Sequence, residues 1–283
     1  MIRNLISAPR TALLAALMAL PALASAGSVF KFTGAVFEQV PGSLSQISVA
    51  DDGTVWGVDD SQRVFQLVTG RNRFEQVAGS LKQISVGSRS QVWGVSAAAK
   101  AYRFDGSVFV NVPGSFSQVS VGSDGTVWGV SPSKQVFRYN PAARVFEGIT
   151  GSLDKISVGS ANAVWGLDSS SGKAYKFSPG NKLFVPVPGT FSDISVGADG
   201  SAWALTANGQ VFRYDAGTKQ MRAMAGKLSS ISVGSAVNVW GINGNSEVFR
   251  LQGSNFVPLS GKLKQIDAGK SGPSGGGAWG VSP

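Results

Sequence analysis

The tripeptide Trp-Gly-Val, or a close copy of it, recurs along most of the chain. The tryptophans are Trp56, Trp93, Trp128, Trp165, Trp203, Trp240 and Trp279, and the gaps between them are 37, 35, 37, 38, 37 and 39 residues. A nearly fixed period of this size is typical of repeat architectures, in which each repeat buries its apolar face against its neighbours. The period therefore restricts the fold before any single element is predicted.

Four short apolar segments recur within each repeat. In one copy they cover residues 116–122, 126–130, 135–139 and 145–149. Each is rich in Val, Ile, Phe or Trp and is bounded by Gly, Asp, Asn, Ser or Pro, which indicates strands and hairpins. Helical periodicity is absent after the first 26 residues. Four antiparallel strands followed by a crossing to the next unit describe one blade of a β-propeller.

The number of blades follows from how the segments are distributed. The first two segments occur seven times, but the last copy lacks the third and fourth, and segments of that kind occur instead at residues 29–32 and 36–40. We therefore predict an all-β, seven-bladed β-propeller of four-stranded antiparallel blades. Its last blade is closed by N-terminal and C-terminal strands, with residues 264–281 pairing with residues 29–40. A six-bladed ring would leave one set of segments unused.

A second period, of two units or about 73 residues, lies over the first. Units one, three and five have Asp-Gly turns, whose glycines supply the positive φ angles of short hairpins. Units two, four and six have other turns. The candidate ligand-binding residues are Asp52, Gly53, Asp124, Gly125, Asp199 and Gly200. If these turns contact the ligand, there are three equivalent binding sites rather than seven.

The seven tryptophans are predicted to be structural. Blades stack face to face, so both faces of each strand are buried, and each indole is expected to pack into the neighbouring blade. The glycine after each tryptophan then leaves room for a large side chain. The alternative is that the indoles are exposed as platforms on which sugars stack.

Two further sets of residues recur once per unit. Serines in the first segment are expected to line or approach a central channel, with Asp267 at this place in the last unit; they are Ser48, Ser85, Ser120, Ser157, Ser195 and Ser232. Without a base they are no catalytic site, and small size with a local hydrogen bond explains them. Cations in the third segment form either a ring of donors or a set of surface charges whose stems cover apolar surface; they are Lys31, Arg103, Arg138, Lys176, Arg213 and Arg250.

The composition excludes many kinds of catalysis. The chain has no Cys and no His, so it has no thiolate nucleophile, imidazole base or Cys/His zinc site. The acidic cluster of Asp51, Asp52, Asp59 and Asp60 matches no calcium-loop motif. We therefore predict a protein that is not an enzyme and that has no cofactor and no metal site.

The first 26 residues have the pattern of a signal peptide. Arg3 and Arg10 precede an apolar run, and the stretch ends in Ala24-Ser25-Ala26, which fits a cleavage site. We expect a propeller domain over residues 27–283, secreted or periplasmic after cleavage near Ala26, with no stable membrane insertion. A membrane anchor that is not cleaved is the alternative, although the apolar run is short for a spanning helix.

The positive charge is spread evenly over the repeats. The formal net charge of +9 falls to +7 without the first 26 residues, which hold two arginines and no acidic residue. Scattered Lys and Arg favour a diffuse attraction to anionic surfaces, or plain solubility, over a nucleic-acid groove. No nucleic-acid partner is predicted.

The repeats resemble the tectonin repeat. The resemblance rests on Gly-Ser-Leu-x-Gln-Ile-Ser-Val-Gly, an Asp-Gly turn, Val-Trp-Gly-Val and Val-Phe-Arg, with the closest copies at residues 42–58 and 114–138. It covers the whole chain after residue 26. Seven units depart from the six blades of several tectonin lectins. The family includes secreted lectins that bind lipopolysaccharide or O-methylated sugars, and protein-binding scaffolds, so the resemblance implies binding rather than turnover.

These observations favour a secreted, multivalent glycan-binding protein that recognises surface glycans such as lipopolysaccharide or O-methylated sugars. Individually weak sites gain avidity when several engage one surface. The alternative is a scaffold that binds a protein partner at the cell envelope or in a secreted complex. A propeller fold by itself does not decide between them, because propellers have many functions.

Overall fold

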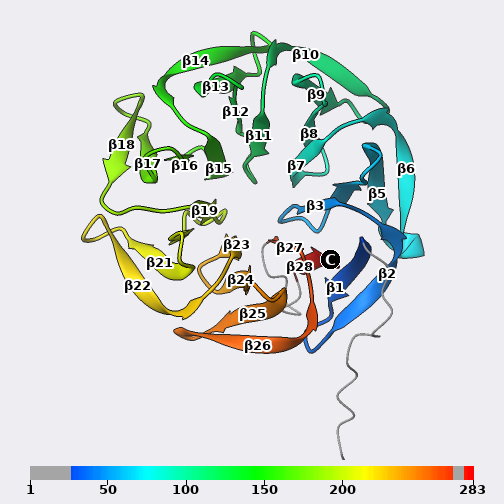
Figure 1. The fold of residues 1–283 in the computed structure, drawn as a ribbon. Helices are drawn as coiled ribbons and strands as arrows, with labels where there is room; N and C mark the ends of the chain where they lie inside the picture. Colours follow the sequence, from blue (N-terminus) through cyan, green and yellow to red (C-terminus); the bar gives the residue numbers. More distant parts are fainter. Residues whose placement is uncertain (1–26, 270–276) are drawn as a thin grey trace, which may run out of the picture.

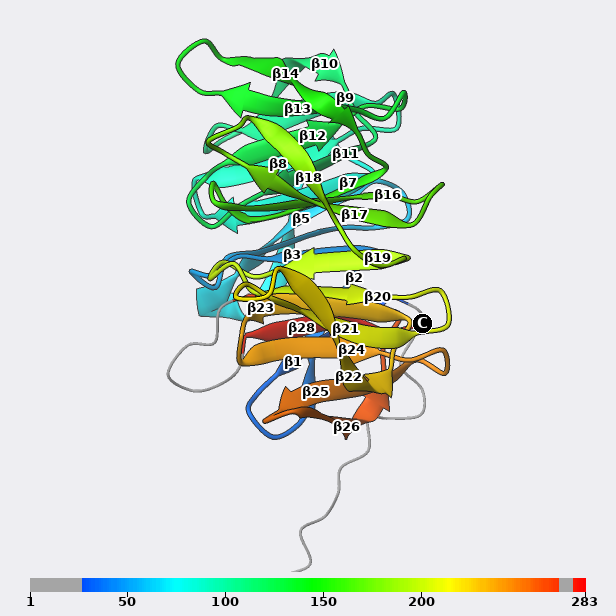
Figure 2. The same ribbon diagram turned by 90° about the vertical axis from the view of Figure 1, so that its left-hand side faces the viewer.

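The protein is a seven-bladed β-propeller in the computed structural model, which describes residues 27–269 and 277–283. Seven four-stranded antiparallel sheets surround a central axis (Figure 1), and successive sheets stack face to face around the ring (Figure 2). The predicted fold is confirmed. Within the described ranges, no helix is long and apolar enough to cross a membrane. The expected signal peptide lies outside these ranges.

Each blade runs from an innermost strand at the axis to an outermost strand at the rim. The innermost strands are β3 (Gln46–Val49), β7 (Gln83–Ser88), β11 (Gln118–Val121), β15 (Lys155–Ser160), β19 (Asp193–Val196), β23 (Ser230–Ser235) and β27 (Gln265–Ala268). The second strands carry the tryptophans and are β4 (Val55–Val58), β8 (Gln91–Val95), β12 (Val127–Val130), β16 (Ala163–Asp168), β20 (Ala202–Leu205), β24 (Asn238–Ile242) and β28 (Ala278–Val281).

The two outer positions of each blade are filled in the same way. The third strands are β1 (Ser28–Phe32), β5 (Arg63–Val68), β9 (Lys100–Phe104), β13 (Gln135–Asn140), β17 (Lys173–Ser178), β21 (Gln210–Asp215) and β25 (Glu247–Gln252). The outermost are β2 (Phe37–Ser43), β6 (Arg73–Ser80), β10 (Phe109–Ser115), β14 (Val145–Ser152), β18 (Leu183–Val187), β22 (Gln220–Lys227) and β26 (Asn255–Lys262). A short 3-10 helix, Thr69–Arg71, joins β5 to β6. We number the blades 1 to 7 in the order of their tryptophans.

Blade 7 is built from both ends of the described chain, as predicted. Its strand order is β2-β1-β28-β27, and β1 pairs with β28 through Val29 opposite Val281 and Lys31 opposite Trp279. The backbone N–H of Ser282 also donates to the carbonyl of Ser28 at 2.9 Å. The paired termini leave no unfinished blade at the seam, which removes an exposed sheet edge.

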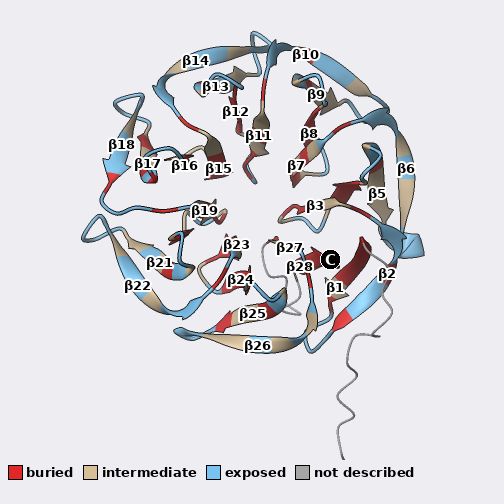
Figure 3. Ribbon diagram, in the orientation of Figure 1, coloured by how far each residue is buried: buried red, intermediate tan, exposed pale blue. Residues whose placement is uncertain are grey.

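The tryptophans form the contacts between blades. Each is at most 4 % exposed, and each packs edge-on against aromatic rings of the next blade. Trp56 of blade 1 lies 4.9 Å from Phe104 of blade 2, and the ring closes where Trp279 of blade 7 lies 6.0 Å from Phe74 of blade 1. Tilted and edge-on aromatic pairs add to the free energy gained from burial alone. Figure 3 shows the result, with buried inner strands and exposed outermost strands.

The glycine after each tryptophan makes room within its own blade. A Cβ atom on Gly57 would lie 2.4 Å from the Leu44 side chain, and one on Gly129 would lie 2.5 Å from Phe116. Leu44 and Phe116 precede the innermost strands of the same blades. The large side chain that the sequence analysis expected therefore belongs to the crossing segment of the same blade. Blade 5 has Ala204 at this place, and its methyl group is fully buried in the cluster that contains Phe191.

Candidate functional site

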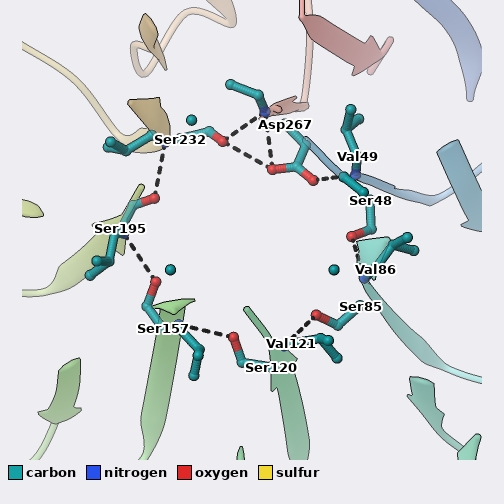
Figure 4. Close-up of a pocket in the computed structure, with 18 of the residues that line it drawn as sticks. Ser48, Val49, Ser85, Val86, Ser120, Val121, Ser157, Ser195, Ser232 and Asp267 are labelled. Atoms are coloured by element: carbon teal, nitrogen blue, oxygen red, sulfur yellow. Dashed lines mark hydrogen bonds between the residues drawn. The ribbon is translucent and has the colours of Figure 1, made fainter. Parts of the chain in front are cut away.

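A circle of serine hydroxyls joins the innermost strands around the central channel (Figure 4). Each Oγ accepts a hydrogen bond of 3.0 or 3.1 Å from a backbone N–H of the next blade. The acceptor and donor residues are Ser48 and Val86, Ser85 and Val121, Ser120 and Val158, Ser157 and Val196, Ser195 and Val233, and Ser232 and Ala268. These hydroxyls tie each blade to the next.

Asp267 completes the circle at the seam between blades 7 and 1. Its Oδ2 accepts a hydrogen bond of 2.8 Å from the N–H of Val49, and its Oδ1 accepts one of 3.0 Å from the Ser232 hydroxyl. Burial raises the pKa of this carboxyl to about 6, although these hydrogen bonds and one from the N–H of Ala268 oppose the rise. A carboxylate thus replaces the hydroxyl where the two ends of the chain meet.

Glutamine amides form a second, incomplete circle along the channel. In each, Oε1 accepts from the N–H and Nε2 donates to the carbonyl of one residue in the next blade. The pairs are Gln265 with Ile47, Gln46 with Ile84, Gln83 with Val119 and Gln118 with Ile156. At the next junction Lys155 pairs with Asp193 instead. The channel has a volume of about 300 Å³. Many of the polar side chains that line it therefore form hydrogen bonds or ion pairs between blades.

The three Asp-Gly turns also connect blades. Asp124 Oδ1 accepts from the N–H of Thr126 in its own turn at 3.0 Å, and its Oδ2 accepts from the N–H of Ala161 in blade 4 at 2.7 Å. Asp52 and Asp199 make the equivalent bonds to Arg89 of blade 2 and Ala236 of blade 6. Each odd turn therefore caps the turn of the following even blade, which gives the two-blade period a physical cause.

The electrostatics of these aspartates follow from the same bonds. Partial burial would raise the pKa of each carboxyl, but the backbone N–H donors outweigh it and hold the pKa below the ordinary value. The glycines have the predicted positive φ angles, +81° at Gly53, +82° at Gly125 and +85° at Gly200.

Each Asp-Gly turn also lies in the wall of a cavity, and we name the three after their odd blades. Turn cavity 1, of about 240 Å³, includes Asp52, Gly53, Lys31, Leu67 and Trp279 in its lining. Turn cavity 3, of about 250 Å³, includes Asp124, Gly125, Gln91, Arg103, Arg138 and Tyr139. Turn cavity 5, of about 520 Å³, includes Asp199, Gly200, Arg213, Tyr214, Asp215 and Arg222.

The three cavities share a set of chemical groups. Each combines the backbone of an Asp-Gly turn with at least one cation from a third strand and an aromatic residue, which is a tyrosine in turn cavities 3 and 5 and the largely buried Trp279 in turn cavity 1. Such a set offers an apolar face together with a few directed hydrogen-bond donors, as small-molecule sites do. The structure therefore brings the six candidate turn residues into three similar places; ligand binding there stays a prediction.

The third-strand cations occupy the register opposite the tryptophans. Five of them lie over the indole of their own blade at 5.3 to 6.0 Å, which covers the ring and favours the reading in which their stems and charges cover apolar surface. They are Lys31, Arg138, Lys176, Arg213 and Arg250. Arg103 makes no such ring contact with the described part of the chain.

Tyr139 and Tyr214 were not predicted as site residues. Both occupy the fifth position of a third strand and line turn cavities 3 and 5. The other five blades carry Leu or Phe at this position, namely Leu67, Phe104, Phe177, Leu251 and Phe32. The tyrosines are therefore confined to blades 3 and 5, and comparing the units at this position would have identified them.

The acidic cluster in blade 1 is divided by its contacts. Asp59 forms an ion pair of 2.6 Å with Arg63, whereas Asp52 belongs to the turn. In the described ranges, no group of three or more His, Cys, Asp or Glu residues is placed to hold a metal ion.

Known structures with this architecture cover nearly the whole chain. One titled "YCF48 bound to D1 peptide" has a TM-score of 0.62 at 12% identity, covering 94% of this chain and 96% of that one. "YCF48 from Cyanidioschyzon merolae" gives 0.61 at 14%, covering 92% and 97%. "Structure of U3-55K" gives 0.65 at 12%, covering 87% and 89%. At these identities the likeness concerns the fold alone.

Sequence comparison assigns the family. The search of curated proteins gave no match. The family profile described as the tectonin domain matches residues 19–104, 95–235 and 214–283, which together span almost the whole chain. The protein therefore belongs to the tectonin domain family.

Proposed function

We propose that this propeller is a secreted, multivalent lectin-like protein whose glycan sites are the three turn cavities. The observation that carries the proposal is their recurrence at every second blade, each with an Asp-Gly turn, a cation and an aromatic ring. Membership of the tectonin family supports a binding propeller of the lectin-like or protein-interaction kind. The ligands we propose are surface glycans such as lipopolysaccharide or O-methylated sugars.

The chemistry of the cavities suits sugars. An aromatic ring offers an apolar face to the C–H groups of a pyranose, and the Tyr139 and Tyr214 hydroxyls and the arginines offer polar groups to its hydroxyls. One shallow cavity of this size binds a saccharide weakly. Three on one rigid ring gain avidity when they engage the same glycan-coated surface.

We propose binding without turnover. The chain offers neither a thiolate nor an imidazole, and the turn aspartates already accept backbone hydrogen bonds at both oxygens. These bonds hold the pKa of each turn carboxyl below its ordinary value, which makes the carboxylate a weaker base. Secretion or transfer to the periplasm remains an expectation from the first 26 residues.

The test combines a glycan array with calorimetric titration of the best saccharide. Three sites per chain are expected, and Tyr139→Ala and Tyr214→Ala should each remove one of them. Tyr175→Ala in blade 4 is the matched control, because Tyr175 does not line a turn cavity and packs in an inter-blade cluster. A stoichiometry near seven, or three sites retained in both cavity variants, would reject the proposal.

A protein-interaction scaffold is the second candidate. The observation that favours it is a row of exposed apolar side chains on the neighbouring outermost strands β10, β14 and β18 and the turn before β10: Val108, Val110, Val145, Leu183 and Val185. These are 41 to 48% exposed. This function would be favoured if the protein bound a defined protein ligand, if Val110→Asp weakened that binding, and if no saccharide on the glycan array were bound.

A further inference from the structure

The three turn cavities have the same construction but different charge. Among the described residues, the lining of turn cavity 3 holds two arginines and one aspartate, that of turn cavity 5 holds two arginines and two aspartates, and that of turn cavity 1 holds one lysine and two aspartates. The formal charge therefore changes from positive to neutral to negative among them. The sequence predicts three equivalent sites, but the three differ in charge. The charge of a site strongly affects which substituents of a bound sugar it accepts.

Arg103 is the unusual residue of turn cavity 3. Its guanidinium forms no ion pair with the described residues. The other five third-strand cations lie over tryptophan rings, whereas Arg103 lacks such a contact. Its Nε atom is buried without an acceptor, but this is not distinctive, because Arg250 also buries its Nε and lines no turn cavity. The feature special to Arg103 is a guanidinium in a cavity wall with neither a carboxylate nor an aromatic ring as partner in the described ranges, which leaves its terminal N–H groups to an anionic ligand.

The other residues that line turn cavity 3 add hydrogen-bond donors and little negative charge that would repel an anion. Arg138 lines the same cavity and forms no ion pair within the described ranges. Gln91 Oε1 accepts from the indole N–H of Trp93 at 3.3 Å, which leaves the amide nitrogen as a donor. Both oxygens of Asp124 accept backbone N–H bonds of 2.7 and 3.0 Å. Its charge is thus partly neutralised before any ligand arrives.

Turn cavity 5 shows the contrast. Its Arg222 forms an ion pair of 2.9 Å with Asp215, and Asp215 lines the same cavity. The second arginine, Arg213, lies over Trp203 at 5.7 Å. Arg138 of turn cavity 3 lies over the tryptophan of its own blade in the same way, at 6.0 Å, so the two cavities differ in the other arginine. An anion entering this cavity would have to compete with the carboxylates already there.

We infer that turn cavity 3 binds the anionic substituent of an acidic saccharide, held between Arg103 and Arg138. The substituent is a carboxylate or a phosphate monoester, because planar guanidinium groups pair with both. The inference rests on the proposed glycan-binding function and makes it specific: one of the three sites selects for acid groups, and the other two take neutral parts of the glycan.

The test is an array of one oligosaccharide backbone that ends in a neutral hexose, the matching hexuronic acid or the matching hexose 6-phosphate. The protein should bind one or both acidic forms about tenfold more tightly than the neutral form, because a charged hydrogen-bonded pair is worth more than a neutral one. Comparing the two acidic forms identifies whether the substituent is the carboxylate or the phosphate. Added salt should reduce the preference.

Variants then locate the preference. Arg103→Gln should bring the acidic and neutral forms to within about twofold of each other while neutral binding is kept, and Arg103→Lys should retain part of the preference since it keeps the charge without the planar fork. Arg250→Gln is the matched control, because it removes the same charge from the same register in blade 6 and lines no turn cavity. Thermal melting checks that all variants fold.

The outcomes separate this inference from the proposed function. Equal binding of all three saccharide forms by the unmodified protein, or an acidic preference that persists in Arg103→Gln, overturns the inference alone. An array without any bound saccharide overturns the glycan-binding function and the inference together. The tenfold preference with its loss in Arg103→Gln, and its retention in Arg250→Gln, supports both.

Discussion

Single side chains tie this ring together. Among the described residues, side chains of one blade bond to backbone groups of the next: serines at six junctions, glutamines at four and turn aspartates at three. Backbone groups at the edge of an innermost strand would otherwise face the channel without protein partners, and an unsatisfied backbone group is costly when it is buried. Asp267 differs from the serines because it carries an ionisable group into this circle.

The buried carboxyl of Asp267 should make the stability of the protein depend on pH. Its pKa is raised to about 6, so its contribution to stability is fully present below the ordinary aspartate pKa and is lost as the pH rises through about 6. Asp267→Asn removes the titrating group but replaces one of two accepting oxygens with an NH2 donor, so it loses a hydrogen bond at every pH. We expect the unfolding free energy of the unmodified protein to fall by at most about 3 kcal/mol from pH 4 to pH 8 relative to that of the variant.

Urea denaturation at pH 4 and pH 8 measures this difference. The hydrogen-bond partners of the carboxyl are the N–H groups of Val49 and Ala268 and the hydroxyl of Ser232, none of which titrates in this range. Asp60→Asn at the exposed start of a turn is the control for losing one carboxylate. The same change in stability between pH 4 and pH 8 for Asp267→Asn and the unmodified protein would show that Asp267 is not a buried titrating group.

The turns between the inner strands explain the two-blade period at the scale of elements. Each Asp-Gly turn accepts two backbone N–H groups, one from its own blade and one from the next, so an odd and an even blade form a locked pair. Blade 7 has no such lock from the described part of its inner turn. The same turns form the walls of the cavities, so the proposed binding sites and the pairing of blades share residues.

Asp124→Ala should loosen the contact between blades 3 and 4. The loss of two N–H bonds to an exposed carboxylate should cost about 1 kcal/mol. Because the pKa of Asp124 is lowered, this contribution is present above the ordinary aspartate pKa and is lost as the pH falls through the folded value. The direct readout is faster amide hydrogen exchange at Ala161, with Asp60→Ala as the charge-matched control. Unchanged exchange at Ala161 would contradict the lock.

Many features of the strands and turns were predictable from the sequence. The strand segments, positive-φ glycines and odd–even alternation are local patterns, and each unit repeats them. The contacts across blades were not predictable in the same way. The bond from Asp124 to Ala161 joins residues 37 positions apart, and its partner is a backbone N–H that any residue type supplies. The unpaired Nε of Arg103 likewise depends on neighbours that only the folded ring defines.

The whole molecule is a closed ring fastened by its two ends. The number of blades and the closure of the ring were predictable from the distribution of the strand segments. Two segments at each end of the repeats make half a blade, and the two halves have to pair to complete the seventh blade. The strand order β2-β1-β28-β27 confirms this. A closed ring fixes the positions of the three turn cavities relative to one another, which the proposed multivalent binding requires.

Removing residues 278–283 should open the ring. This deletion takes away β28, which lies between β27 and β1, together with Trp279 and its contact with Phe74 of blade 1. We expect a large fall in melting temperature, or loss of cooperative unfolding, measured by circular dichroism and size-exclusion chromatography. Removing the exposed Pro283 alone is the control. A truncated protein that melts at the same temperature as the full chain would contradict closure by the termini.

The most direct test of the turn cavities as glycan sites is a crystal structure of the protein bound to a neutral oligosaccharide selected on the array. We expect sugar density beside Asp52, Asp124 and Asp199, in contact with Tyr139 in turn cavity 3 and Tyr214 in turn cavity 5. Sugar bound in the central channel or on the outermost strands, with all three turn cavities empty, would contradict the assignment.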